Sequence, residues 1–173
     1  MGTIKQIHLG LFEMIGWENF FIAEVGASAA LLGLIFVGVS INLTRILSIP
    51  GLPNRALLAL TLLLTILIMS SLLLVPGQSL ALVGIELLLI GLFVWITATV
   101  FDVIILQKKE AQYRVPYLSN IAFNQLALLP YIIAGIIVLT RGAGGLYWLV
   151  PAIIISFIKA LLDAWVLLVE INR

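Results

Sequence analysis

Five long stretches of apolar residues dominate the chain, and short polar segments separate them. The apolar stretches cover residues 17–43, 56–75, 80–106, 119–139 and 146–171. An α-helix rises ~1.5 Å per residue and the hydrocarbon core of a bilayer is ~30 Å thick, so about twenty apolar residues cross it once. Each stretch reaches that length, which predicts five transmembrane helices.

The polar segments carry turn-forming residues and none is long enough to house a soluble domain. Glycine, proline, serine or asparagine occur in residues 48–54, 76–79 and 141–145. The longest polar segment, residues 107–116, is predicted to be a loop, because Pro116 disfavours helical backbone just before it. We therefore predict an all-α, polytopic membrane helical bundle with one transmembrane domain over residues 17–173.

Residues 1–16 differ from the five apolar stretches. Ile4, Ile7, Leu11 and Met14 recur at helical spacing and polar residues lie between them. This pattern predicts a short N-terminal amphipathic helix that lies in the membrane interface.

Composition supports a membrane protein and narrows its chemistry. Hydrophobic residues make up 63% of the chain and charged residues only 10%, whereas soluble domains carry about 25% charged residues. The absence of cysteine excludes disulfides, thiolate catalysis and cysteine metal sites. The single histidine, His8, lies outside the apolar stretches, and no metal-binding or nucleotide-binding motif occurs. We therefore expect a protein that is not an enzyme, with no metal, no cofactor and no nucleic-acid partner.

Basic residues are distributed unevenly across the predicted topology. One side of the membrane holds six of them and the opposite side holds only Lys5 and Arg141. Lysine and arginine near span ends are retained in the cytoplasm, which predicts a cytoplasmic C-terminus and an external N-terminus. The six are Arg45, Arg55, Lys108, Lys109, Arg114 and Arg173.

Side-chain size predicts where two of the helices lie. The first apolar stretch presents a face of small residues, and small faces let helices approach closely in lipid. We expect this helix to lie inside the bundle, although the same face would also serve association between copies of the chain. The second stretch is rich in leucine and lacks charge, so it is predicted to face lipid. The small residues are Ala23, Gly26, Ala27, Ala29, Ala30, Gly33 and Ser40.

Four ionisable residues fall well inside the apolar stretches, where a charge costs at least about 2.5 kcal/mol. Lys159 and Asp163 are one helical turn apart and are predicted to form an ion pair, which either fixes the packing of the last helix or belongs to a polar pathway. Glu24 and Glu86 lie at matched depth on helices that run in the same direction. If those helices are neighbours, the two carboxylates share a proton or bind a cation; otherwise they reach headgroup water.

A second set of polar residues gathers near the predicted cytoplasmic face. We expect an ion pair between Arg45 and Asp102, and hydrogen bonds from the asparagines across the inner end of the bundle. We interpret this cluster as structural: its side chains form hydrogen bonds that hold neighbouring helices together. Its members are Asn42, Arg45, Asp102, Asn120, Asn124 and Gln125.

The first half of the chain also carries a recognisable series of segments. They are FFIAEVGASAA (residues 20–30), GLIFV (33–37), SINL (40–43), RIL (45–47), LP (52–53), RAL (55–57) and LVPGQS (74–79). These segments resemble small bacterial integral membrane proteins, some of which are labelled "modulator of FtsH protease". The resemblance implies a bacterial inner-membrane protein that acts on a proteolytic complex, and it assigns no catalytic residue.

Two functions from different classes remain open. The leading hypothesis is a non-enzymatic protein that acts through helix–helix contacts, as a homo-oligomer or as an accessory subunit of a membrane complex. The alternative is a small proton or cation channel or transporter that uses Glu24, Glu86, Lys159 and Asp163. Besides the lipid bilayer, the expected partner is therefore another copy of the chain or another membrane protein.

Overall fold

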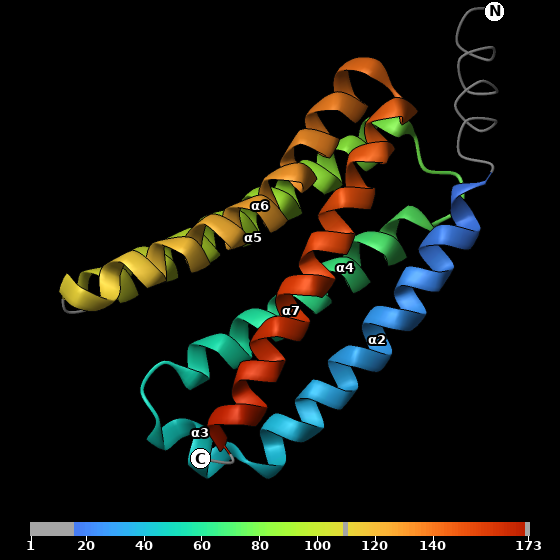
Figure 1. Ribbon diagram of the computed structural model, residues 1–173. Coiled ribbons are helices and arrows are strands. Elements are labelled where there is room, and N and C mark those ends of the chain that lie inside the picture. The colour runs from blue at the N-terminus through green and yellow to red at the C-terminus, as the bar shows by residue number, and fades with distance from the viewer. Residues whose placement is uncertain (1–15, 109–110, 172–173) are drawn as a thin grey trace, which may run out of the picture.

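The computed structural model describes residues 16–108 and 111–171, and nearly all of them are helical (Figure 1). The helices are α2 (Trp17–Ile41), α3 (Leu43–Ser48), α4 (Leu52–Leu73), α5 (Leu80–Lys108), α6 (Ala111–Arg141), the 3-10 helix η1 (Ala143–Trp148) and α7 (Leu149–Ile171).

Five of these helices are long and apolar enough to cross a membrane, which confirms the predicted all-α multi-span fold. The predicted interfacial helix and His8 lie outside the described residues.

Glycines set the start of two membrane helices. Gly16 and Gly51 immediately precede α2 and α4, with φ angles of 117° and 92° that only glycine adopts without strain. Pro53 occupies the first turn of α4, where a missing backbone N–H removes no intrahelical hydrogen bond.

The predicted loop at residues 107–116 is wrong. α5 continues to Lys108 and α6 begins at Ala111, so Pro116 lies inside a helix. Pro116 is the sixth residue of α6 and removes one backbone hydrogen bond, but Ala111, Gln112 and Arg114 around it are good helix formers.

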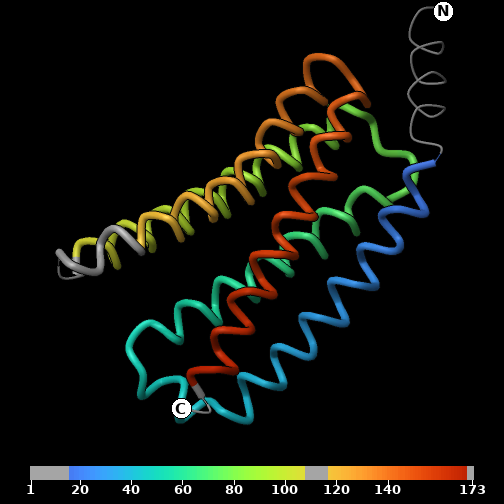
Figure 2. The backbone as a smooth tube through the Cα atoms, viewed as in Figure 1, coloured from blue at the N-terminus to red at the C-terminus, as the bar shows by residue number. Residues whose placement is uncertain are grey.

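The helices form two units that meet at an angle. α2, α4 and α7 lie side by side, and α5 and α6 form a long antiparallel hairpin that projects away from them (Figures 1 and 2). α6 also packs against α7, whereas α4 contacts α5 over a shorter length. The two units therefore diverge between α4 and α5.

Glycines allow the close approach of α5 and α6. A Cβ atom added to Gly135 of α6 would lie 2.8 Å from the backbone nitrogen of Leu88 in α5. A Cβ atom at Gly84 of α5 would lie 2.7 Å from the Leu139 side chain of α6. Both distances are too short for real atoms, so this interface depends on the missing side chains.

The predicted positions of the first two membrane helices are wrong. In α4, 50% of the apolar window is buried, whereas in α2 only 11% is buried. α4 contacts α2, α7 and α5, while α2 packs mainly along α4 and occupies the edge of the bundle. Hydrophobicity misled the prediction because lipid is as apolar as a protein interior, so a leucine-rich helix fits either environment.

Candidate functional site

An ion triad links α4 and α7; its two members on α7 are buried and its member on α4 is partly exposed. Lys159 and Asp163 form the predicted ion pair one turn apart on α7, with side chains only 4% and 2% exposed. Asp163 also accepts a hydrogen bond through Oδ1 from Nη1 of Arg55, at 3.3 Å. One carboxylate is therefore shared by two cations inside the membrane domain.

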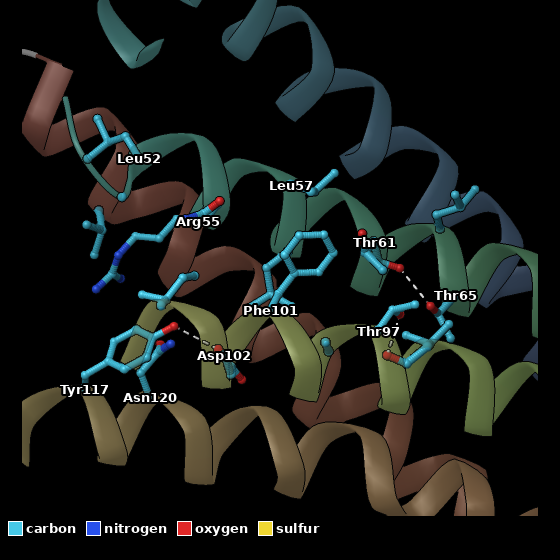
Figure 3. Close-up of a pocket in the computed structure, with 18 of the residues that line it drawn as sticks. Leu52, Arg55, Leu57, Thr61, Thr65, Thr97, Phe101, Asp102, Tyr117 and Asn120 are labelled. Carbon is cyan, nitrogen blue, oxygen red and sulfur yellow. Dashed lines mark hydrogen bonds between the residues drawn. The ribbon is translucent and has the colours of Figure 1, made fainter. Parts of the chain in front are cut away.

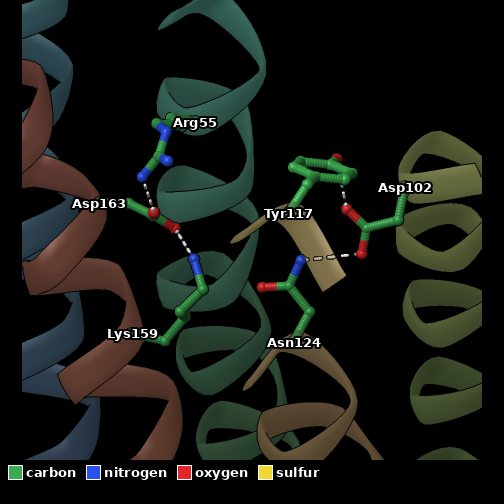
Figure 4. Close-up of polar contacts among 6 residues, drawn as sticks. All are labelled: Arg55, Asp102, Tyr117, Asn124, Lys159 and Asp163. Atoms are coloured by element: carbon green, nitrogen blue, oxygen red, sulfur yellow. Dashed lines mark hydrogen bonds and ion pairs between the residues drawn. The ribbon is translucent and has the colours of Figure 1, made fainter. Parts of the chain in front are cut away.

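A second polar group lies beside the triad and joins α5 to α6 (Figure 4). Tyr117 donates its hydroxyl hydrogen to Oδ1 of Asp102 at 3.0 Å, and Nδ2 of Asn124 donates to Oδ2 at 2.8 Å. Asp102 and Asn124 are both buried. Both carboxylate oxygens thus have a hydrogen-bond donor.

We call the triad and this second group together the charge network. It consists of Arg55, Asp102, Tyr117, Asn124, Lys159 and Asp163. It holds two cations and two carboxylates, so the formal charges cancel. Cancellation matters because an unpaired charge inside a bilayer is costly, while a paired and hydrogen-bonded one is tolerated.

The predicted ion pair between Arg45 and Asp102 is wrong. Arg45 is exposed on α3, and the described residues show no ion pair that includes it. α2 ends at Ile41 and the short helix α3 follows, so Arg45 does not continue along the α2 axis. The cation that contacts a carboxylate inside the bundle is instead Arg55. Arg55 was predicted to lie in a connection, but α4 begins at Leu52, four residues earlier than predicted, and therefore includes it.

The remaining residues of the predicted inner cluster do not form one network. Nδ2 of Asn42 donates to the Gly38 carbonyl of its own helix at 3.0 Å. Gln125 accepts a hydrogen bond from Nε1 of Trp95 and donates to Oγ1 of Thr99 at 3.0 Å, which ties α6 to α5. These contacts support the structural interpretation of Asn42 and Gln125.

The structure places Glu24 and Glu86 in separate surroundings. Glu86 accepts hydrogen bonds from Nε2 of Gln78 at 3.1 and 3.2 Å. Glu24 is partly buried on α2, and its Oε2 atom has no hydrogen-bond donor among the described residues. α2 packs along α4 rather than along α5, and no hydrogen bond joins the two carboxylates in the described part of the chain.

A cavity of about 750 Å³ adjoins the charge network where α4 and α5 diverge. Figure 3 shows Arg55, Asp102, Tyr117 and Asn120 gathered at one end of it. The rest of its wall is mainly apolar, with Leu57 and Phe101 among its residues. Within residues 16–108 and 111–171, no cluster of three or more histidine, aspartate or glutamate side chains could hold a metal ion.

The cavity was not predicted from the sequence. Its apolar walls have the same composition as any membrane helix, so no sequence signal marks them. Arg55 was the one available clue, because it directly precedes an apolar stretch.

Comparisons with protein-family models, with curated proteins and with solved structures find no match to this chain. The resemblance of its first half to proteins labelled modulators of FtsH protease therefore remains a prediction.

Proposed function

We propose that this protein is a non-enzymatic integral membrane protein that acts through helix contacts made by the outer face of α2. In this proposal α2 binds a helix of a second copy or of a larger membrane complex, such as a membrane protease. The proposal includes the predicted inner-membrane location with a cytoplasmic C-terminus, since the basic residues favour that orientation.

The observation that carries the proposal is a small-residue face that has no neighbour among the described residues. Gly26, Ala29, Ala30 and Gly33 are all exposed on α2. A Cβ atom added to Gly26 or Gly33 would meet no atom within 4 Å. Packing inside the described chain therefore does not account for these glycines.

Exposure to lipid does not account for them either. Glycine in a helix costs about 0.5–1 kcal/mol relative to alanine, so a lipid-facing helix gains nothing from it. Other lipid-facing positions in this chain carry large side chains, including Leu89 of α5, which is 62% exposed, and Trp165 of α7, which is 66% exposed. A close contact with another helix uses small residues, because they let two backbones approach.

Photo-crosslinking in native membranes tests this proposal directly. A photoreactive amino acid replaces Leu34, which is 69% exposed beside the small-residue face, and in a separate control it replaces Leu89 of α5. We expect a covalent adduct from position 34 and none from position 89. An adduct of twice the chain mass identifies a homo-oligomer, and any other discrete mass identifies a partner subunit.

Two matched variants complete this test. Ala30→Leu enlarges an exposed position on the small face, and Ala122→Leu makes the same change at an exposed position of α6. Ala30→Leu should abolish the adduct and Ala122→Leu should leave it unchanged. Equal crosslinking from positions 34 and 89, or an adduct that survives Ala30→Leu, contradicts the proposal.

The channel hypothesis has weaker support. Its four residues fall into separate groups with local hydrogen bonds or ion pairs: Lys159 with Asp163, Glu86 with Gln78, and Glu24 on α2. A proton or cation pathway needs groups that connect from one side of the membrane to the other. The contacts of the described residues do not favour such a connection.

A further inference from the structure

The α5–α6 hairpin is joined to the other helices by two short links. Residues 74–79 connect α4 to α5, and Gly142 connects α6 to η1. Gly77 and Gly142 have φ angles of 76° and 82°, in the left-handed region that glycine adopts without strain. Both links lie at the same end of the molecule (Figures 1 and 2). They therefore provide a pair of pivots about which the hairpin can turn.

The cavity between α4 and α5 lies away from these pivots. Its lining on α5 begins at Ile90 and ends at Ile105. Ile90 is ten residues beyond the first residue of α5, a rise of about 15 Å. The space that separates α4 from α5 is therefore on the part of the hairpin that a rotation about the links would displace most.

The charges on the two sides of the cavity are unevenly paired. Asp163 pairs with both Lys159 and Arg55. Asp102 accepts hydrogen bonds from two uncharged side chains of α6, and no ion pair among the described residues includes it. One buried carboxylate thus has two cations, and the other has none.

Arg55 is the cation of the charge network that is free to move. Its side chain is 38% exposed and lines the cavity together with Asp102 (Figure 3), whereas Lys159 is only 4% exposed. The charge of Arg55 also acts on the Tyr117 hydroxyl, which donates to Asp102. Arg55 is therefore within electrostatic range of the group that lacks a cation.

We infer that the α5–α6 hairpin closes onto α4 about its two links and that Arg55 then pairs with Asp102. Lys159 keeps Asp163, so each buried carboxylate has one cation in the closed form. Charges in a medium of low polarity are tolerated when they are paired and hydrogen-bonded. Closure therefore gives the more even distribution of the same four charges.

A small rotation is sufficient for this change. Asp102 is 22 residues beyond the start of α5, about 33 Å along the helix axis. A hinge rotation of about 10° therefore moves Asp102 by about 6 Å, and moves the first turn of α5 by only about 1 Å. The hydrogen bond from Tyr131 of α6 to Ser156 of α7 lies nearer to the links, so that contact shifts by less than half as much as Asp102.

The walls of the cavity suit such a closure. Leu57 and Leu64 of α4 and Phe93 and Phe101 of α5 line the cavity and are exposed. Hydrophobic exclusion does not drive helices together in lipid, so packing these side chains against each other changes the free energy only modestly. The open and closed forms are therefore close in free energy, and one ion pair decides between them.

Distances between two spin labels test the inference. The chain has no cysteine, so labels attach only to cysteines that are introduced. One pair replaces Trp165 of α7 and Leu118 of α6, which are both exposed and outside the cavity lining. The full chain is placed in lipid nanodiscs, diluted with unlabelled chain and measured by pulsed electron paramagnetic resonance. We expect two populations of distances, of which the shorter is the closed form.

Three single variants identify the ion pair. Asp102→Asn removes the charge and keeps an oxygen that accepts a hydrogen bond, and Arg55→Gln removes the cation. Each should lower the shorter-distance population at least threefold. Arg45→Gln is the matched control, because Arg45 is exposed and forms no ion pair among the described residues, and it should leave the populations unchanged.

A double variant should act in the opposite direction. Lys159→Met with Asp163→Leu removes the carboxylate that competes for Arg55, so the shorter-distance population should rise at least threefold. A second label pair, at Trp165 and at Ile41 of α2, lies outside the hairpin and should give one unchanged distance in every variant that folds.

Two results would overturn the inference. One is a shorter-distance population that Asp102→Asn and Arg55→Gln do not change. The other is the absence of that population from both the wild type and the double variant. The inference is independent of the proposed function, since Gly33→Leu on α2 should leave both populations as they are in the wild type.

Discussion

The α5–α6 interface and the outer face of α2 both contain glycines, but the structure gives them different roles. Gly84 and Gly135 lie against the opposite helix so closely that any side chain would collide with it. Gly26 and Gly33 on α2 meet nothing within 4 Å. A small residue in a membrane helix thus marks a close contact only where a neighbour is present, and for Gly26 and Gly33 no described residue supplies that neighbour.

Buried charges show the same contrast. Lys159, Asp163, Arg55 and Asp102 have partners on neighbouring helices or on the same helix. Glu24 on α2 has a carboxylate oxygen with no donor among the described residues. These four charged groups inside the bundle therefore each have a partner within the chain, whereas one oxygen of Glu24 has none among the described residues. The same is true of the uncharged Ser70 hydroxyl and Asn124 amide oxygen.

The largest effect is expected when the internal compensation is broken. Asp163→Leu leaves Lys159 and Arg55 without their shared carboxylate, and removing one partner of a buried ion pair destabilises a protein by about 3–5 kcal/mol. Reversible unfolding in mixed detergent micelles measures the loss in free energy of unfolding.

A double variant provides the control for this prediction. Lys159→Met with Asp163→Leu removes the buried pair together and leaves only Arg55, which is 38% exposed and can reach the interface. The double variant should be more stable than Asp163→Leu alone. If the two are equally unstable, the Lys159–Asp163 pair does not act as a unit.

The next effect distinguishes the two kinds of glycine. Gly135→Ala places a methyl group against the backbone of Leu88 and should lower the free energy of unfolding by about 1–3 kcal/mol through overpacking. Gly33→Ala meets open space and should raise the free energy of unfolding of the monomer by about 0.5–1 kcal/mol through helix propensity. Destabilisation of the monomer by both changes would show that α2 packs differently from the structure.

A third prediction concerns association rather than folding. Gly33→Leu should leave the free energy of unfolding of the monomer within about 1 kcal/mol of the wild type, since space around the residue is open. It should nevertheless abolish crosslinking from position 34, because a large side chain keeps the partner backbone away. The crosslinked fraction in native membranes measures this effect.

The smallest effect is expected at Glu86. The Glu86→Gln side chain keeps an oxygen that accepts a hydrogen bond from Gln78. The free energy of unfolding of this variant should therefore differ from that of the wild type by less than about 0.5 kcal/mol. Reconstituted liposomes should show the same background proton and cation leak for the wild type and this variant. A leak that requires Glu86 would favour a channel over the α2 contact.

The sequence predicted those parts of the fold that depend on local properties. Apolar length predicted five membrane helices, and the four-residue spacing of Lys159 and Asp163 predicted their ion pair. Asp102 and Asn124 were assigned to one polar cluster, and they do form a hydrogen bond. Each of these predictions needs only the geometry of a single helix or the high cost of a polar group in lipid.

The sequence by itself could not determine which helix lies at the centre, which cation reaches Asp163, or that a cavity opens between α4 and α5. Membrane helices do not bury their most apolar faces preferentially, because lipid and protein interior have similar polarity. Neighbours are chosen instead by shape, through close approaches such as that of Gly135 to Leu88. Shape complementarity belongs to pairs of helices, and only the tertiary structure decides which helices form those pairs.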